Sequence, residues 1–523
     1  MALDTRLLAL ASLLSTPALA LADEGAQLAN LVPDAGISPF DFFGNSVAVD
    51  DGVVAVGNIG FDLPGLLDVG NCTLFDAVTG AELRTLVANN PNQGDGSGVG
   101  VAMDNGRVAV AANNTDNAGP SSGSVYVYDV ATGNQLFELT ASDAQQEDSF
   151  GTSIDVDGDL LVVGARFEDF GAPNSGAAYI FDLTTGTELH KLVPGDPGFN
   201  DFFGQRVAIR GNTVVVGSVN EDSVAVNAGA AYVFDAVTGN QLAKLTASDG
   251  EQSDSFGRSV AVDDNYIVVG ASSGGDPGEF SGAAYVYDST TFAELHKFVP
   301  ANHGLSDSFG AACAADGGVA VIGAQTFNPD GVSASNGNAY VYDLATGTLL
   351  TELQGNDTNA GDQFGNTVAI DGEFIAVGAW FKDDGGTDLG GAAYSFDWSD
   401  SSWVDLGSAL AGAGGDPLLE GDGPLVAGCT LDLHLSNAAP SAVLLYVIGI
   451  AEANMPAFGG TLVPNPNLFV LGLMTDPLGE HTLSNTVNMT PPSGLSLYAQ
   501  AWIADMGGPL GFAASNGVRQ DAP

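Results

Sequence analysis

Short apolar runs recur along the chain in a fixed order of hydrophobic and polar positions. Each copy holds a Phe-Gly step, an apolar run, a two-residue turn and a second apolar run, as in the stretch 253–271 (SDSFGRSVAVDDNYIVVGA). Two further strand-like segments complete the unit. A period of about 53 residues is typical of a repeat architecture. The glycines of the Phe-Gly steps are Gly44, Gly151, Gly204, Gly257, Gly310 and Gly365, and Gly100, after Val99, is assigned to the same position, which gives seven copies.

Each copy predicts four strands. In the fourth copy they cover residues 206–209, 213–217, 230–234 and 241–245. The second strand is continuously apolar, which is typical of a strand buried on both faces, whereas the fourth alternates between polar and apolar residues, as in 188–192. Buried inner strands and half-exposed outer strands indicate blades packed around an axis. The sequence therefore predicts an all-β protein with a seven-bladed β-propeller.

The lengths of the turns indicate which face of the propeller varies. Links from the first to the second strand are two-residue hairpin turns, whereas the links from the second to the third strand and from the fourth strand to the next blade are long. Because antiparallel strands alternate in direction, all long links fall on one face, called here the long-loop face. Residues 27–32 (QLANLV) resemble a fourth strand, so we expect them to complete the seventh blade and close the ring.

The two ends of the chain depart from the repeat. Residues 1–22 combine a basic residue, a short apolar core and small residues, which predicts a secretory signal peptide and a secreted, cell-surface or periplasmic protein. We predict that the propeller spans 23–400. Residues 401–523 lose the repeat, and their alternating runs between Pro-rich turns predict a small C-terminal β-sandwich domain. No apolar run has the length of a membrane-spanning helix.

The charge of the chain is strongly one-sided. Lys and Arg number 12 against 64 Asp and Glu, a formal net charge of −52. This excess would repel phosphate backbones and therefore excludes a nucleic-acid partner. Two interpretations of the acids remain, a solvated surface of a secreted protein or weak multi-site cation binding. Three cysteines, Cys72, Cys313 and Cys429, cannot make a complete disulfide framework. Cys72 and Cys313 occupy apolar repeat positions, where we expect them to act as small buried apolar side chains.

The segment FSGAAYVYDS, which follows SFGRSVAVDDNYIVVGA, resembles the bacterial FG-GAP repeat, which is related to the propeller of integrin α chains. The resemblance covers about residues 27–398. Calcium-binding versions of this repeat carry an Asp-rich loop between the first two strands, but here that link has only two residues. Asp155, Asp157 and Asp159 in DVDGD lack the glycine position and the closing acid of such a loop. We therefore predict no cofactor and no metal site, with weak Ca²⁺ binding as the alternative.

The sequence offers few groups for catalysis. It has five histidines, and His190 and His296 occupy the same fourth-strand position two repeats apart, which indicates a structural role. No nucleophile or phosphate-loop motif has its required setting. An acid stands three residues before each Phe-Gly glycine, and its recurrence favours an Asx-type turn that orders the loop. These acids are Asp41, Asp148, Asp201, Asp254, Asp307 and Asp362.

The loops between the second and third strands hold the best candidates for recognition. They place aromatic residues beside acids on the long-loop face, a combination that suits a sugar ring or a basic peptide. The alternative is that the acids recur for turn geometry and the aromatic rings pack on the rim. The ligand-binding candidates are Phe167, Glu168, Asp169, Glu221, Asp222, Trp380, Phe381, Asp383 and Asp384.

The leading hypothesis is a secreted, non-catalytic binding or adhesion scaffold that acts as a monomer. It would present long acidic and aromatic loops to an extracellular protein or glycan, with the C-terminal module as spacer or attachment. One alternative is a structural, envelope-associated repeat protein without a dedicated ligand. Another is a hydrolase or lyase housed in the propeller channel.

Overall fold

The computed structural model describes two compact units, one formed by Gly25–Trp398 and one that includes Ser399–Pro523. In the described residues all regular elements are β-strands. The predicted signal peptide, residues 1–22, lies outside the described residues. The structure describes residues 25–34, 36–274, 281–301, 307–327, 336–383 and 389–398 of the first unit and, of the second, 404–407, 410, 417–422, 430–436, 438–449, 452–457, 460–464, 468–476, 481–486, 496–505, 512–515 and 517–521.

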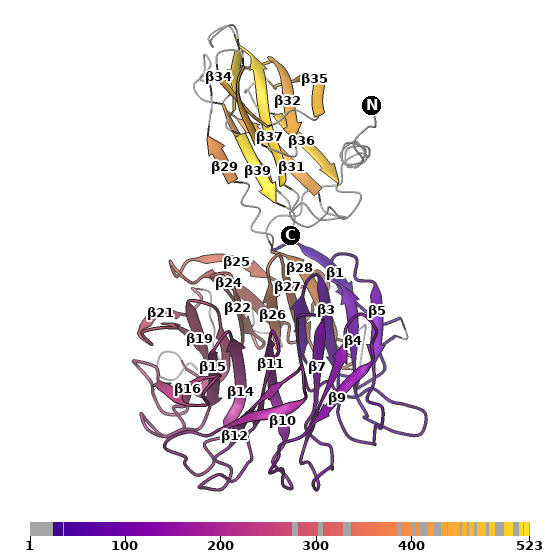
Figure 1. The fold of residues 1–523 in the computed structure, drawn as a ribbon, viewed down its shortest axis with the longest axis vertical. Helices are drawn as coiled ribbons and strands as arrows, with labels where there is room; N and C mark the ends of the chain where they lie inside the picture. The colour runs from indigo at the N-terminus through magenta and orange to yellow at the C-terminus, as the bar shows by residue number, and fades with distance from the viewer. Residues whose placement is uncertain are drawn as a thin grey trace. The chain divides into compact units, whose positions relative to one another are not determined.

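The first unit contains seven four-stranded antiparallel sheets, here called blades one to seven in chain order (Figure 1). Blades one to four are, in turn, β2 (Val47–Asp50), β3 (Val53–Asn58), β4 (Asn71–Asp76) and β5 (Glu82–Leu86); β6 (Gly100–Asp104), β7 (Arg107–Ala112), β8 (Ser124–Asp129) and β9 (Gln135–Leu139); β10 (Phe150–Asp157), β11 (Leu160–Ala165), β12 (Ala177–Asp182) and β13 (Thr187–Leu192); β14 (Phe203–Arg210), β15 (Thr213–Ser218), β16 (Ala230–Asp235) and β17 (Gln241–Leu245).

Blades five to seven continue the same order. They are β18 (Phe256–Val262), β19 (Tyr266–Ala271), β20 (Ala283–Asp288) and β21 (Glu294–Phe298); β22 (Phe309–Asp316), β23 (Val319–Ala324), β24 (Asn338–Asp343) and β25 (Leu349–Leu353); β26 (Val368–Asp371), β27 (Phe374–Ala379), β28 (Ala392–Asp397) and β1 (Gln27–Leu31). The innermost strand of each blade contacts that of the next, and β26 contacts β2. The sheets therefore form a closed ring, the arrangement of a β-propeller.

The seventh blade is completed from the other end of the repeat region. Strand β1 pairs antiparallel with β28, with Asn30 opposite Tyr394 and Leu31 opposite Ala393. The predicted pairing of the first strand with the last blade is thus confirmed. It covers the outer edge of β28, which would otherwise be open at the point where the ring closes.

Neighbouring blades approach most closely at the Phe-Gly steps. A parallel bridge joins the residue before the glycine of one blade to the glycine that precedes the third strand of the blade before it. At Gly176, with φ of +87°, a Cβ atom would lie 1.8 Å from the carbonyl oxygen of Phe203. Only glycine fits such a contact. The bridges are Gly70–Ser97, Gly123–Phe150, Gly176–Phe203, Gly229–Phe256, Gly282–Phe309, Gly337–Phe364 and Gly391–Phe43.

The structure corrects the assignment of the repeat position in blade two. Ser97 makes the bridge to Gly70, and Gly98, with φ of +98°, stands where the other blades have the Phe-Gly glycine. Gly100 is instead the first residue of β6. Because Ser97 replaces the phenylalanine, the sequence pattern assigned the repeat position to Gly100 instead of Gly98, two residues earlier.

The tight-turn face carries a second set of contacts between blades. Most innermost strands end on an aspartate whose carboxylate accepts a backbone N–H from the first turn of the next blade. Examples are Gly211 N to Asp157 Oδ2 at 2.9 Å and Asp51 N to Asp371 Oδ2 at 3.0 Å, the latter across the closure. Blade four has Arg210 at this position, and its guanidinium pairs with Asp264 at 3.1 Å instead. Neighbouring blades are therefore joined by close backbone contacts at glycines on the long-loop face and by aspartate carboxylates on the tight-turn face.

The second unit contains two larger sheets that share one apolar core. Leu433 and Leu435 of one sheet pack with Tyr446, Ala501 and Ile503 of the other. The first sheet is β29 (Val404–Gly407), β39 (Gly517–Asp521), β37 (Ser496–Ala504), β32 (Val443–Gly449) and β35 (Leu468–Met474), with β38 (Phe512–Ala514) beside β37; the second is β30 (Leu418–Asp422), β31 (Thr430–Ser436) and β36 (His481–Thr486); β33 (Glu452–Ala457) and β34 (Gly460–Pro464) form a separate pair.

Adding one methyl group at the Phe-Gly contact tests its role. We expect Gly176→Ala to destabilise the propeller by about 3 kcal/mol or more, because the Cβ atom meets a backbone oxygen that cannot move alone. The control is Gly211→Ala, which also has positive φ but has no atom within 4 Å of its Cβ position. This control should cost only about 1 kcal/mol. Urea unfolding of both variants measures the difference, and equal losses would contradict a steric role.

Candidate functional site

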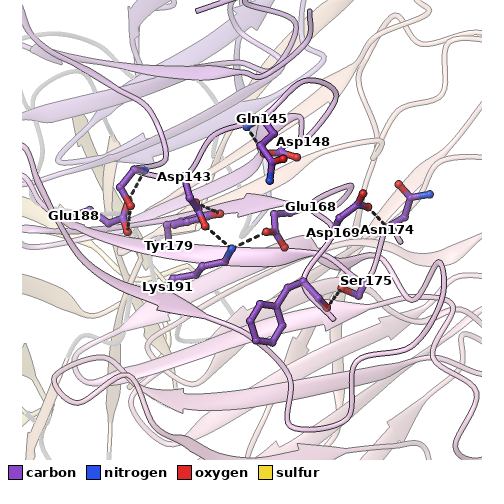
Figure 2. A network of polar contacts seen from close by, with 12 residues as sticks. Asp143, Gln145, Asp148, Glu168, Asp169, Asn174, Ser175, Tyr179, Glu188 and Lys191 are labelled. Atoms are coloured by element: carbon purple, nitrogen blue, oxygen red, sulfur yellow. Dashed lines mark hydrogen bonds and ion pairs between the residues drawn. The ribbon is translucent and has the colours of Figure 1, made fainter. Parts of the chain in front are cut away.

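Glu168, a predicted ligand-binding acid, lies in the loop between β11 and β12 but is only 5% exposed. Its Oε1 atom lies 2.6 Å from the ammonium of Lys191, which also contacts Asp143 Oδ2 at 2.7 Å. The hydroxyl of Tyr179 donates to the other oxygen of Asp143 at 2.9 Å, and Figure 2 shows these four side chains converging. The network ties two long loops to the two outer strands of blade three.

The same network recurs in blade four with the second predicted acid. Glu221, also 5% exposed, lies 2.9 Å from Lys244, which contacts Asp196 at 2.7 Å. Tyr232 donates to Asp196 at 2.9 Å. Glu168 and Glu221 thus hold loops in place, and their burial leaves little of either carboxylate open to a ligand.

The other blades alter the network in informative ways. Blade five keeps Lys297, which contacts Asp249 at 2.6 Å, but has Gly274 at the position of the glutamate. Blade seven has Lys382 at that position, and its ammonium lies 3.3 Å from Asp357. The position therefore accepts either charge, provided that a partner of opposite sign lies nearby.

Asp169 and Asp222 are exposed, but each also orders its own loop. The Oδ1 atom of Asp169 accepts the backbone N–H of Asn174 at 2.8 Å (Figure 2), and Asp222 accepts that of Asn227 at 2.7 Å. Both asparagines adopt positive φ. These bonds correspond to the alternative in which acids recur for turn geometry.

The acids before the Phe-Gly steps also order their loops. Six such acids each accept the backbone N–H of the residue three positions earlier, at 2.6 to 2.7 Å, as Asp148 does from Gln145 (Figure 2). These acids order their loops as predicted, but not through the predicted Asx turn, which would bind the N–H two residues later. Asp95 has the same role in blade two. The sequence pattern did not identify it, because Ser97-Gly98 replaces the Phe-Gly step there. The acids with this bond are Asp41, Asp95, Asp148, Asp201, Asp254 and Asp362.

Trp380 and Phe381 belong to an aromatic cluster with two residues that the sequence analysis missed. Their rings stack at 4.4 Å, and the ring of Phe42 lies 6.2 Å from Trp380 and 6.0 Å from Phe381. Phe40 lies 6.5 Å from Phe42 and is 56% exposed. Because ring closure brings blade one beside blade seven, loops more than 300 residues apart meet. We call Phe40, Phe42, Trp380 and Phe381 the aromatic cluster.

The neighbouring acids of blade seven are only partly described. Asp383 is half-buried, and its backbone N–H bonds to the carboxylate of Asp362. Asp384 lies outside the described residues. Trp380 donates its indole N–H to Gln363 Oε1 at 2.9 Å, which fixes the plane of the ring.

A groove on the long-loop face begins at the aromatic cluster. Its volume is about 200 Å³, and Phe42 contributes to both features. Ile59 and Val99 add apolar surface, while the amides of Asn113 and Asn114 line the same groove. Aromatic area next to amide groups is an arrangement that suits a sugar ring.

Comparison with known families identifies the repeat. The sequence model of the FG-GAP repeat matches six segments that together cover more than half of the chain, residues 81–128, 134–181, 187–234, 240–287, 292–342 and 348–396. The protein belongs to the FG-GAP repeat family. Each match begins at the fourth strand of one blade and ends at the third strand of the next, so the FG-GAP unit straddles two blades. A search of curated proteins finds no match to the chain.

The FG-GAP propeller encloses a central channel of about 310 Å³, lined by the innermost strands of all seven blades. Burial raises the pKa of two of its carboxyls, Asp50 to about 6 and Asp155 to about 7. Asp155 Oδ2 accepts the backbone N–H of Ile209 at 2.7 Å, a contact between blades. The raised pKa values therefore belong to groups that join blades, and they do not by themselves indicate a reaction.

The DVDGD segment is fully engaged within the FG-GAP ring. Asp155 and Asp157 accept backbone N–H groups of blade four, and Asp159 pairs with Arg107 at 2.6 Å. Among the described residues, no group of three or more His, Cys, Asp or Glu side chains is arranged to hold a metal ion. These residues also contain no helix with the length and apolar character needed to cross a membrane.

Removing a lysine from the loop network tests what it stabilises. We expect Lys191→Met to destabilise the propeller by about 2 kcal/mol, because it leaves the buried carboxylate of Glu168 without its cation. Lys297→Met is the matched control, since blade five lacks the glutamate and Asp249 is half exposed, and it should cost less than about 1 kcal/mol. Thermal unfolding compares the two. Equal losses would show that the buried glutamate adds nothing.

The buried carboxyls predict an unusual dependence of stability on pH. Burial raises the pKa of Asp50, Asp148 and Asp201 to about 6 and that of Asp155 and Glu373 to about 7. The folded state therefore binds protons more tightly than the unfolded chain. The stability from these groups is complete below about pH 4 and is lost as the pH rises through 6 to 7.

We therefore expect the unfolding temperature to rise by about 5 °C or more between pH 7.5 and pH 5. Asp143, Asp196 and Asp249 do not reverse this trend, because their lysine and tyrosine partners lower their pKa values despite burial, and they titrate below this window. Differential scanning calorimetry at constant ionic strength measures the change. A fall in unfolding temperature over the same range would contradict the sign of these shifts.

Proposed function

We propose that the protein is a secreted, non-catalytic binding scaffold that holds a carbohydrate ligand on the long-loop face of its FG-GAP propeller. The ligand lies in the groove that begins at the aromatic cluster. In this proposal residues 1–22 direct export, 23–400 form the binding propeller, and 401–523 serve as spacer or attachment.

The aromatic cluster is the observation that supports this proposal best. Three of its rings lie within 6.2 Å of one another, and Phe40 beside them stays exposed, although apolar rings of this size are normally buried. The adjoining groove offers amide donors and acceptors to hydroxyl groups. A sugar presents both an apolar face and such hydroxyls.

The contacts of the loop acids argue against a basic peptide as the ligand. A basic peptide would need open carboxylates, but Glu168 and Glu221 are paired with lysines, and Asp169 and Asp222 accept backbone N–H groups. These four acids thus have structural partners already. The groove is lined by the neutral Asn113 and Asn114 and by one acid, Asp68, so it offers both amide and carboxylate oxygens to the hydroxyls of a ligand.

A glycan array probed with the full chain tests the proposal, followed by titration of any ligand found. We expect Phe42→Ala and Trp380→Ala to weaken binding at least about tenfold, because Phe42 lines the groove and Trp380 packs beside it in the aromatic cluster. Phe199→Ala is the matched control, an exposed phenylalanine (69%) in the long loop after β13. It should bind as the unaltered chain does.

Two outcomes would contradict the proposal. The array could show no bound glycan, which would favour a structural repeat protein without a dedicated ligand. Alternatively, glycan binding could survive Phe42→Ala and Trp380→Ala while both variants unfold at the normal temperature. That result would place the binding surface away from the aromatic cluster.

A further inference from the structure

Three arginines gather at the long-loop end of the propeller channel. Arg166 directly follows β11 in blade three, Arg206 lies in β14 of blade four, and Arg258 lies in β18 of blade five. Arg206 lines the channel itself. Innermost strands begin on the long-loop face, so the early positions of Arg206 and Arg258 in their strands place both near that end.

These arginines have no acidic partner in a chain with an excess of acids. Among the residues that the structure describes, none of the three forms an ion pair, although the chain has 64 Asp and Glu against 12 Lys and Arg. By contrast, Arg107 and Arg210 each contact a carboxylate, as do the lysines of the loop networks. Because acids are so abundant in this chain, the lack of an acidic partner for these three arginines in the described ranges indicates that they have a role other than pairing with acids of the fold.

The hydrogen bonds of the three guanidinium groups leave donors free within the described part of the chain. Arg166 Nη1 donates to Gln205 Oε1 at 3.0 Å, and Arg206 Nη1 donates to the Gln205 carbonyl at 2.9 Å. The Nε atom of Arg166 is buried without a partner. A buried donor without an acceptor costs free energy, which a bound acceptor would restore.

The repeat does not require these arginines. The other blades carry small residues at the position of Arg206, and none of them has a cation at the positions of Arg166 and Arg258. The residues equivalent to Arg206 are Ser46, Gly100, Ser153, Ser259, Ala312 and Thr367; those equivalent to Arg258 are Asn45, Val99, Thr152, Gln205, Ala311 and Asn366; those equivalent to Arg166 are Ile59, Asn113, Val219, Ser272, Gln325 and Trp380.

The positive charges of the three arginines destabilise the folded state. Burial, together with the charges of Arg258 and Arg166, lowers the pKa of Arg206 to about 9. Burial also lowers the pKa of Arg166 and of Arg258. Like charges held together away from water are unfavourable unless an opposite charge joins them.

Aromatic packing holds Arg166 in position. Its guanidinium carbon lies 4.4 Å from the ring centre of Phe167, and that ring meets Phe202 edge-on at 5.5 Å. Phe167, a predicted ligand-binding residue, thus contributes by orienting a cation. Arginine stacked on an aromatic ring keeps its planar donors free for a partner.

We propose that Arg166, Arg206 and Arg258 form a site for an oxyanion, a carboxylate, sulfate or phosphate group, at the long-loop end of the channel. Three guanidinium groups supply planar paired donors that match the oxygens of such groups. The site lies on blades three to five, whereas the aromatic groove involves blades seven, one and two, so the two proposals stand independently.

Isothermal titration calorimetry of the full chain with pyrophosphate, citrate and sulfate, at constant ionic strength and pH 7, tests the site. We expect saturable binding of at least one probe with a dissociation constant of about 1 mM or below. Arg206→Gln should weaken it at least about tenfold, because it removes charge-assisted hydrogen bonds. Arg84→Gln is the control for loss of one positive charge, since Arg84 lies on the outer strand β5.

The stability of the variant without anion gives a second measurement. Arg206→Gln removes a half-buried charge that has no acidic partner among the described residues, so it should unfold at the same temperature as the unaltered chain or higher. Binding of citrate alone would assign the site to carboxylates, and binding of pyrophosphate or sulfate alone would assign it to phosphate or sulfate groups. The proposal is wrong if no probe binds saturably, if Arg84→Gln loses binding equally, or if Arg206→Gln lowers the unfolding temperature in the absence of anion.

Discussion

The close backbone contact at each Phe-Gly step is the constraint on which the propeller depends. A glycine before the third strand of one blade meets the residue before the Phe-Gly glycine of the next at a distance that excludes a Cβ atom. The phenylalanine ring packs in the apolar core between blades: Phe203 meets Tyr232 and Phe234 of its own blade and shares a core cluster with Ile180 of blade three. This contact sets the spacing of the blades, and the long loops leave the ring directly beside it.

The acid excess follows from how this ring satisfies its backbone. Aspartates accept N–H groups in the long loops, in the turns before the outer strands and between blades on the tight-turn face. A carboxylate offers two acceptor oxygens and no donor, which suits loops rich in unpaired N–H groups. Few cations are needed for this work, and two of them, Lys191 and Lys244, pair with buried glutamates. The negative net charge is therefore explained by the loop and turn structure and does not by itself indicate a ligand.

The strands, the closure by β1 and the family could be predicted from the sequence because each repeats a local pattern or completes one. The candidate site could be predicted only in part. Whether Glu168 faces solvent depends on Lys191, 23 residues later, and on a register that the sequence does not specify. Phe42 joins Trp380 only through ring closure, and Gly98 was missed because Ser97 breaks the letter pattern.

The repeat itself separates structural residues from candidates for function. A residue that recurs in most blades, such as Asp148 or Tyr179, meets a demand of the fold that every blade shares. A residue that differs from its equivalents in the other blades is not required by the repeat, so its presence calls for another explanation. Phe40 and Trp380 of the aromatic cluster and the three arginines differ in this way, and both groups lie at the long-loop end of the ring. The fold thus supplies seven nearly equal positions, and both proposed binding sites lie where single blades differ.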